Sequence, residues 1–238
     1  NVTQSGTLPS LTSTGTISIA SSRTFSLTGG EFKNDGGTLA GTGILSLSTT
    51  TLTAQQATAI PASLSVIFTG VTVNGPGTFT NSGGLDLNNG NNTINADFTN
   101  NGLVTTANTA NTFVGTVLNN GTMTLDSSVP VTQWAKAGLT NNGTLNLGNN
   151  SSPSMTLKVD GGLTNNAGKQ IATVDNGQVV IDAVLNNQGT LTINNSTLTL
   201  NRASAQHTNS GLINVVGVGS LNVTQSGTLP SLTSTGTI

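Results

Sequence analysis

Charge is scarce in this sequence. The 238 residues include only 6 Lys and Arg and 8 Asp and Glu, so 6% of the chain is charged and the net charge is −2. Ordinary globular proteins carry about a quarter. Without a basic surface the chain lacks the electrostatic footprint of a nucleic-acid-binding protein and of a protein recruited to anionic membranes. No stretch approaches the ~18 consecutive apolar residues of a membrane span. We expect neither nucleic acid nor membrane as a partner of this segment.

Cysteine is absent and histidine occurs once, as His207. A zinc site or a Ser–His–Asp triad needs more of these residues than the chain offers. Calcium-binding solenoids use Gly-Gly-x-Gly-x-Asp, and the Gly-Gly pairs that begin at positions 29, 36, 83 and 161 lack the Asp. We therefore expect no metal and no cofactor. The lack of cysteine is compatible with an extracellular protein.

Thr, Asn and Gly take the place of charge. They number 43, 31 and 30 residues, while 34% of the chain is hydrophobic. Thr, Val and Ile favour strands, whereas Asn and Gly favour turns. Disordered chains lack such aliphatic content, so the composition predicts an ordered, nearly all-β protein.

The chain contains an exact internal duplication. Residues 1–17 and 222–238 both read NVTQSGTLPSLTSTGTI, and their starting positions differ by 222 − 1 = 221. A perfect match of this length indicates a long tandem array. We expect residues 1–221 to form one complete repeat and residues 222–238 to begin the next identical copy, so that the chain is an interior part of a longer protein.

A shorter period lies inside the long one. The triplet Asn-x-Gly, or a close variant, recurs mostly at sequence intervals of 19 to 24, and two longer intervals, of 47 and 46, each fit two turns. This spacing predicts about ten coils of ~22 residues per repeat. The predicted turn residues are Asn34, Asn81, Asn100, Asn119, Asn141, Asn165, Asn186 and Asn209, with Gly83, Gly102, Gly121, Gly143, Gly189 and Gly211.

Many of these turns lead into Gly-x-Φ-x-Φ, where Φ is apolar. Alternation with period two is typical of a strand with one buried face. The predicted core ladder consists of Ile17, Ile19, Leu45, Leu47, Leu85, Leu87, Met123, Leu125, Leu145, Leu147, Leu191, Ile193, Ile213 and Val215.

One such unit cannot bury its own apolar face, whereas stacked units form continuous inner ladders. We expect Gly and Asn at the corners because they reach left-handed backbone angles at low cost. Stacked Asn side chains can also form an amide ladder. The sequence therefore predicts an all-β fold, a parallel β-solenoid (a right-handed β-helix) that rises about 48 Å per repeat. An antiparallel sandwich would not return the same corner at this regular interval.

Carboxylates are the candidate catalytic groups, since glycoside hydrolysis needs two within ~10 Å. Asp175 and Asp182 are the closest such pair in the apparent strand region, but no neighbouring Lys or Arg completes a lyase site. We read the carboxylates as solvated surface groups and expect no enzyme. His207 takes a position that carries Phe or Leu in other coils, which indicates packing at a coil edge. Trp134 fits either a sugar platform or a small flap packed over a coil, and we favour the flap.

Threonine rows raise the possibility of ice binding, which needs a flat and regular Thr array. Outward positions include Thr122, Thr124, Thr144, Asn146, Thr190 and Thr192. The intervening coil carries Lys169 and Gln170, so we favour ordinary β-propensity as the explanation.

Units such as Leu139-Thr-Asn-Asn-Gly-Thr-Leu-Asn-Leu147 resemble those of large bacterial surface exoproteins, namely autotransporter passengers and filamentous-haemagglutinin-type adhesins. The resemblance covers most of the chain at the level of the short repeat. It implies a right-handed β-helical shaft, export to the cell surface, and an adhesive or matrix-forming role. The Asn-Pro-Asn-Gly secretion signature of those families is absent, so their export route is not implied.

The sequence thus predicts the structural shaft of a giant extracellular fibre or adhesin. Its partners would be identical repeats joined end to end, with lateral association between fibres as a further possibility. The alternatives are a carbohydrate-binding or polysaccharide-acting β-helix and an ice-binding Thr face.

Overall fold

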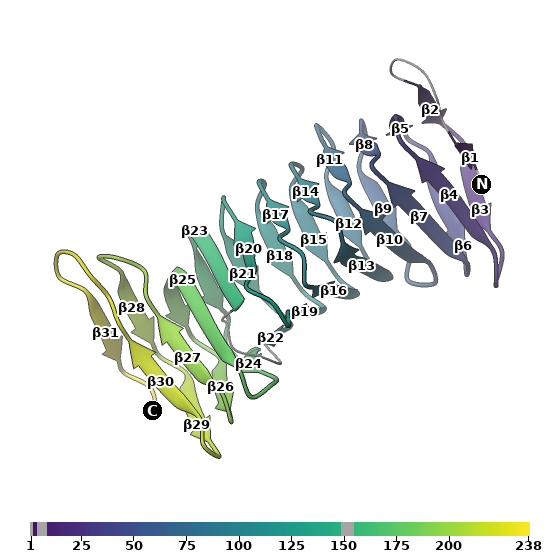
Figure 1. Cartoon of the computed structure of the whole chain (residues 1–238). Helices are drawn as coiled ribbons and strands as arrows, with labels where there is room; N and C mark the ends of the chain where they lie inside the picture. Colours follow the sequence, from purple (N-terminus) through teal and green to yellow (C-terminus); the bar gives the residue numbers. More distant parts are fainter. Residues whose placement is uncertain (1, 4–8, 149–154) are drawn as a thin grey trace.

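The structure is a computed structural model that describes residues 2–3, 9–148 and 155–238. Within these ranges every regular element is a β-strand, and every strand pair is parallel. Figure 1 shows the strands as one elongated stack that follows chain order from the N-terminal to the C-terminal end. The predicted all-β parallel solenoid of about ten coils is confirmed.

Each coil contributes one strand segment to each of three faces, and corners separate the faces. Face I is an 11-stranded sheet, and faces II and III join into an 18-stranded sheet because β23 and β25 each continue from one face to the next. Face I comprises β1 (Val2–Thr3), β4 (Thr24–Thr28), β7 (Ile44–Ser48), β10 (Ser65–Thr69), β13 (Gly84–Asn89), β16 (Leu103–Ala107), β19 (Thr122–Asp126), β22 (Thr144–Leu147), β24 (Gln170–Thr173), β26 (Thr190–Asn194) and β29 (Leu212–Val216).

The other two faces follow the same order along the stack. Face II comprises β2 (Ser10–Ser13), β5 (Glu31–Asn34), β8 (Thr51–Ala54), β11 (Thr72–Asn74), β14 (Thr93–Ile94), β17 (Thr112–Phe113), β20 (Thr132–Ala135), the first parts of β23 (Met155–Asn165) and β25 (Gln178–Asn187), β27 (Thr197–Leu200) and β30 (Ser220–Val223). Face III comprises β3 (Thr16–Ile19), β6 (Thr38–Gly41), β9 (Thr58–Ile60), β12 (Phe79–Asn81), β15 (Phe98–Asn100), β18 (Val117–Asn119), β21 (Leu139–Asn141), the last parts of β23 and β25, β28 (Gln206–Asn209) and β31 (Ser231–Ser234). At the start of face III, β3 and β6 pair as a separate two-stranded sheet.

The core is a set of apolar columns that run along the stack. On face I, Val104, Met123 and Leu145 are consecutive Cα partners. Each inward side chain is covered by its counterparts in the coils above and below, and full burial of such a side chain contributes about 1.5–3 kcal/mol. The predicted ladder residues that are buried are Ile19, Leu45, Leu47, Leu85, Leu87, Met123, Leu125, Leu145, Leu147, Leu191, Ile193 and Ile213.

Three ladder residues differ from the expectation. Ile17 and Ile19 lie in β3 on face III, where they pair with Leu39 and Gly41 instead of joining the face I column. Ile17 is only partly buried. Val215 is 42% exposed although it pairs with Ile193 below it. It lies in the last strand of face I, so no further strand covers it.

Aromatic side chains form a stack of their own in the middle of the solenoid. The ring centroids of Phe68 and Phe79 are 6.0 Å apart, those of Phe79 and Phe98 are 5.6 Å apart, and those of Phe98 and Phe113 are 5.4 Å apart. These separations suit offset stacking, which adds to area burial. Four of the six Phe residues, contributed by all three faces, therefore form one continuous aromatic stack in the core.

The corner glycines are needed for a reason other than the expected one. None of the six predicted turn glycines and none of the eight predicted turn asparagines has a positive φ, so left-handed backbone angles do not explain them. A Cβ at Gly102 would lie 2.2 Å from the carbonyl oxygen of Gly83, and one at Gly121 would lie 2.2 Å from that of Gly102. Glycine is required because consecutive coils approach too closely for a side chain.

This contact predicts the effect of adding one methyl group. Gly121→Ala should lower the free energy of unfolding by about 1–3 kcal/mol, the typical cost of overpacking. Gly84→Ala is the matched control, because its Cβ would find no atom closer than 3.7 Å. Urea unfolding followed by circular dichroism measures both. Equal unfolding midpoints for the two variants would contradict the close-contact explanation.

Candidate functional site

A ladder of buried asparagines runs along the corner between faces III and I. It consists of Asn81, Asn100, Asn119, Asn141, Asn165, Asn187 and Asn209, which follow one another as Cα partners. All seven are completely buried. A buried amide must satisfy its donors and acceptors within the protein, and here each amide does so mainly with its neighbours in the ladder.

Each ladder amide donates toward the next coil. Asn100 Nδ2 lies 2.7 Å from Asn119 Oδ1 and 3.0 Å from the carbonyl oxygen of Thr122. Its Oδ1 accepts from Asn81 Nδ2 at 2.9 Å and from the Gly102 amide at 3.2 Å. The same pattern repeats to Asn209, whose Nδ2 lies 3.0 Å from Ser234 Oγ. Asparagine suits this column because one side chain is both donor and acceptor.

Two predicted turn residues fall outside this ladder. Asn187, and not Asn186, occupies the buried position, because Asn187-Gln188-Gly189 is the regular Asn-x-Gly triplet and the turn was predicted one residue too early; Asn186 faces outward and pairs with Thr164 and Thr208. Asn34 lies at the corner between faces II and III, where its Cα partners are Ser13 and Ala54. The long interval from Asn34 to Asn81 therefore includes a change of corner.

Sequence reasoning missed a second buried polar ladder, at the corner between faces I and II. Asn92 Nδ2 donates to Asn111 Oδ1 at 2.9 Å, and Asn111 Nδ2 donates to Gln133 Oε1 at 3.3 Å. The same amide oxygens accept from the backbone N–H groups of Val71, Asn92 and Asn111. Asn92 and Asn111 are separated by 19 residues, as are Asn81 and Asn100. This equal spacing is the feature of the sequence from which the second ladder could have been predicted.

The ladder predicts a position-specific cost. Asn119→Ala should lower the free energy of unfolding by about 1–3 kcal/mol for each buried partner left unpaired. The groups that lose a hydrogen bond are Asn100 Nδ2, Asn141 Oδ1 and Thr144 O. The neighbouring Asn120 is exposed, and Asn120→Ala should change stability little. Chemical denaturation of both variants checks the difference, which a similar loss for Asn120→Ala would contradict.

An exposed row of amides flanks the buried ladder. Asn120 Nδ2 donates to Asn101 Oδ1 at 2.9 Å, Asn142 Nδ2 donates to Asn120 Oδ1 at 3.2 Å, and Asn166 continues the row by donating to Asn142. A hollow of about 430 Å³ borders these residues, with Thr122, Thr144 and Lys169 among its lining. Its lining is mainly amides, hydroxyls and glycines.

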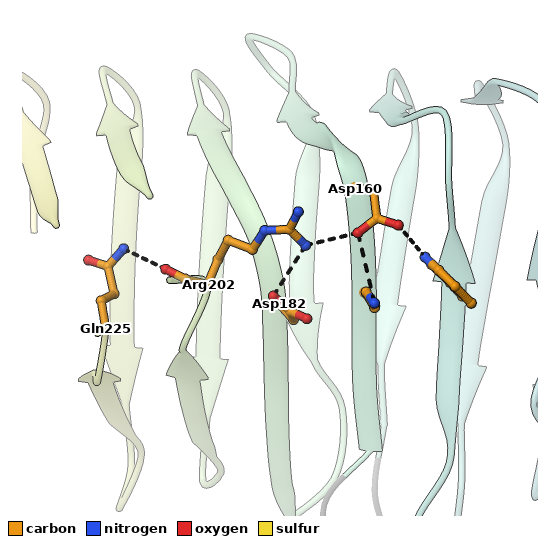
Figure 2. Close-up of polar contacts among 6 residues, drawn as sticks. Asp160, Asp182, Arg202 and Gln225 are labelled. Atoms are coloured by element: carbon orange, nitrogen blue, oxygen red, sulfur yellow. Dashed lines mark hydrogen bonds and ion pairs between the residues drawn. The ribbon is translucent and has the colours of Figure 1, made fainter. Parts of the chain in front are cut away.

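The charge of the chain is concentrated on face II. Five of the 14 charged residues gather around Trp134, and together they make up what we term the charged cluster, namely Trp134, Lys136, Lys158, Asp160, Asp182 and Arg202. Figure 2 shows the Arg202 guanidinium reaching back across the strands toward Asp182 and Asp160. Arg202 Nη1 lies 2.9 Å from Asp160 Oδ1 and 3.4 Å from Asp182 Oδ1.

Trp134 is already engaged by this cluster. Its indole Nε1–H donates to Asp160 Oδ2 at 2.7 Å, and the Nζ atoms of Lys136 and Lys158 each lie 4.4 Å from the ring centroid. The hydrogen bond from Arg202 is the main reason that the pKa of Asp160 is lowered. Trp134 lies within β20 and is not part of a flap, so the expectation of a flap was wrong. The cluster braces consecutive coils against one another.

The two carboxylates singled out from sequence do not meet. Asp182 faces outward in the charged cluster, whereas Asp175 follows β24 near Asp126. A Cβ at Gly148 would lie 2.7 Å from both Asp126 Oδ1 and Asp175 Oδ2, so these carboxylates flank one point. Burial, aided by the charge of Asp126, raises the pKa of Asp175. The close acidic pair is thus Asp126 with Asp175.

His207 is part of the apolar core. It is completely buried on face III, where Leu232 is its Cα partner in the next coil. Its Nδ1 accepts a hydrogen bond from the Leu185 amide at 3.0 Å, and its Nε2 has no partner. Desolvation by burial lowers the pKa of His207. The neutral ring is therefore the form that the fold accommodates.

This burial gives stability a pH dependence. An unfolded histidine binds a proton near pH 6.5, while the folded ring resists it, so the free energy of unfolding should fall as pH decreases below about 6.5. The loss is at most ~1.4 kcal/mol per pH unit. His207→Gln keeps an acceptor for the Leu185 amide without titrating, and should lose less stability between pH 7.5 and 5. Parallel losses in the two proteins, measured by urea denaturation, would contradict this role.

The Thr rows are irregular on face I. The outward column that contains Thr122 and Thr144 continues with Gln170, Thr190 and Leu212. The column of Thr124 continues with Asn146, Ala172 and Thr192. A longer uninterrupted Thr column, which sequence reasoning missed, lies on face II and consists of Thr51, Thr72, Thr93 and Thr112. It leads to Trp134 in the next coil.

Comparison with protein-family models, with curated proteins and with solved structures finds no match to the chain. Among the described residues, no three His, Cys, Asp or Glu side chains gather as metal ligands would. The same part of the chain holds no helix with the length and hydropathy to cross a bilayer. The solenoid itself is therefore the feature from which a function can be inferred.

Proposed function

We propose that the chain is a structural repeat of a stiff fibre shaft, in which each copy continues the solenoid of the copy before it. The single observation that carries this proposal is that residues 222–238, the duplicated segment, add strands to the stack. β30 pairs with β27, β31 pairs with β28, and Thr237 pairs with Leu212. The first residues of one copy thus continue the parallel strand pairing of the previous copy.

Exposed apolar side chains at the C-terminal end of the stack support this continuation. Among the described residues, six of the ten large hydrophobic side chains that are exposed lie between positions 212 and 238, namely Leu212, Val215, Val218, Val223, Leu229 and Ile238. An open solenoid end also presents unpaired backbone groups, which invite pairing with another chain. A following coil would cover the backbone together with Val215 and Val223, which continue the buried columns of Ile193 and Leu200.

The role we propose is mechanical and not enzymatic, and it is carried out at the cell surface or in an extracellular matrix. Support comes from the resemblance of the short repeat to bacterial surface exoproteins and from the absence of cysteine. Asp160 and Asp182 both form ion pairs with Arg202. This pairing favours a structural contact between coils over a catalytic or sugar-binding site. An adhesin stalk or a biofilm fibre is the biological form that fits such a shaft.

Rod length tests the proposal. Proteins with one, two and three tandem copies should form rods that lengthen by about 50 Å per copy at constant cross-section, because neighbouring strands are about 4.8 Å apart. Small-angle scattering and negative-stain electron microscopy measure this. A radius of gyration that grows as in a compact globule would overturn the shaft.

The open end gives a second measurement. The 238-residue chain should associate end to end with rising concentration, and Val223→Lys should weaken this association at least several-fold. Val184→Lys is the matched control, since Val184 and Val223 are both 42% exposed but Val184 lies within the stack. Sedimentation velocity reports the change, and equal effects of the two variants would count against end-to-end contact.

A further inference from the structure

The two copies of the duplicated segment lie on different faces. Ser10–Ser13 forms β2 on face II, where it pairs with β5, whereas the identical Ser231–Ser234 forms β31 on face III, where it pairs with β28. Thr16 begins β3 on face III, while its duplicate Thr237 pairs with Leu212 of face I. Val2 lies on face I and its duplicate Val223 lies on face II. Each duplicate is displaced by one face in the same direction.

The number of coils per repeat explains this displacement. Face I contains 11 strands from β1 to β29, which mark ten complete coils. The duplicate of β1 then lies one face further on, in β30. One repeat, residues 1–221, consequently spans ten and one-third coils.

The corner residues agree with this count. Ser13 at the corner between faces II and III pairs with Asn34, whereas its duplicate Ser234 accepts from Asn209 at the corner between faces III and I. A Cβ at Gly236 would lie 2.0 Å from the carbonyl oxygen of Gly211. The duplicate therefore enters the ladder of the preceding copy with the close backbone contact that the ladder requires.

We infer that adjoining repeats meet through an interface rotated by one face, so that a second copy of this chain places each of its surfaces one face further around the axis. This inference rests on the proposed shaft. The charged cluster lies on face II in one copy, on face III in the next and on face I in the third. After three copies, about 31 coils or ~150 Å at the usual strand spacing, the arrangement repeats.

This offset changes what the fibre presents to its surroundings. A repeat of ten whole coils would place every charged cluster on one side, whereas the offset distributes it over all three. The asparagine ladder is divided in the same way: it continues from Asn209 through Ser234, the duplicate of Ser13, to the next copy's equivalent of Asn34, and the rest of that copy's ladder lies at another corner. Lateral contacts of the fibre are therefore spread around its axis instead of along one edge.

Engineered disulfides in the 238-residue chain test the offset, because the chain has no cysteine of its own. Cα partners on neighbouring strands are close enough for a disulfide. Thr208→Cys with Thr233→Cys, and Thr199→Cys with Asn222→Cys, should each cross-link on oxidation by glutathione disulfide. Thr199→Cys with Thr233→Cys should not, because these residues lie on different faces.

The outcomes separate the offset from the shaft. Cross-linking of the Thr199–Thr233 pair alone would indicate a repeat of ten whole coils, which overturns the offset and leaves the shaft intact. If none of the three pairs cross-links, the duplicated segment does not stack, and both proposals fail. Mass spectrometry of the digested protein identifies the linked peptides.

A three-copy protein tests the consequence for the fibre. Val184→Cys, introduced in every copy and labelled with maleimide gold, should place particles about 50 Å apart along the rod and on successive sides. Electron tomography distinguishes this arrangement from particles along one side. A one-sided row on a rod of normal length would overturn the offset.

Discussion

The spacing of parallel strands is the constraint on which this structure depends. Because each strand pairs in register with the strands one coil away, every side chain lies about 4.8 Å from the residue at the same position of the next coil. This spacing favours residue types whose side chains can pack against, or hydrogen-bond to, an identical side chain in the next coil. Leu and Val form dry columns, Asn forms amide ladders such as Asn100 on Asn119, and Gly allows backbones to approach.

The same constraint accounts for the scarcity of charge. Like charges in one outward column would repel across a single strand spacing, so a solenoid built of similar coils gains little from Lys or Asp. In the charged cluster opposite signs adjoin: Lys158 and Asp182 are Cα partners, and Arg202 reaches both Asp160 and Asp182. The charged cluster therefore joins neighbouring coils through contacts between opposite charges.

Stability and proposed function come from one set of contacts. The columns, the ladders and the backbone pairing all act along the axis, so each coil depends on its neighbours and none forms a separate core. A shaft needs this property, since it must continue through many copies. His207 and Asp175 are local departures from the pattern, and the pKa of each is shifted because burial disfavours the charged form of its side chain.

The prediction of the turn glycines was accurate in outcome but incomplete in cause, whereas the predictions for Asn186 and Trp134 were wrong. The turn glycines lie at corners as expected, but their role is close approach and not a left-handed backbone, which depends on the distance between coils and cannot be read from one coil. The turn was placed at Asn186, one residue too early, although Asn187-Gln188-Gly189 is itself an Asn-x-Gly triplet; the pairing of β25 with β23 and β28 identifies Asn187 as the buried residue. Trp134 could not be placed from sequence because its partners Lys158 and Asp160 come from the next coil.

By itself the sequence determined the all-β stacked fold, the approximate coil length and the inward direction of most residues in the predicted core ladder, since periodic alternation of Leu, Asn and Gly encodes which residues face inward. The tertiary structure decided which face each strand occupies. Face assignment depends on the accumulated length of every preceding coil, and coils of unequal length differ in their corners without changing the repeated motif. The displacement of Ser231–Ser234 from face II to face III therefore became visible only when all the coils were stacked.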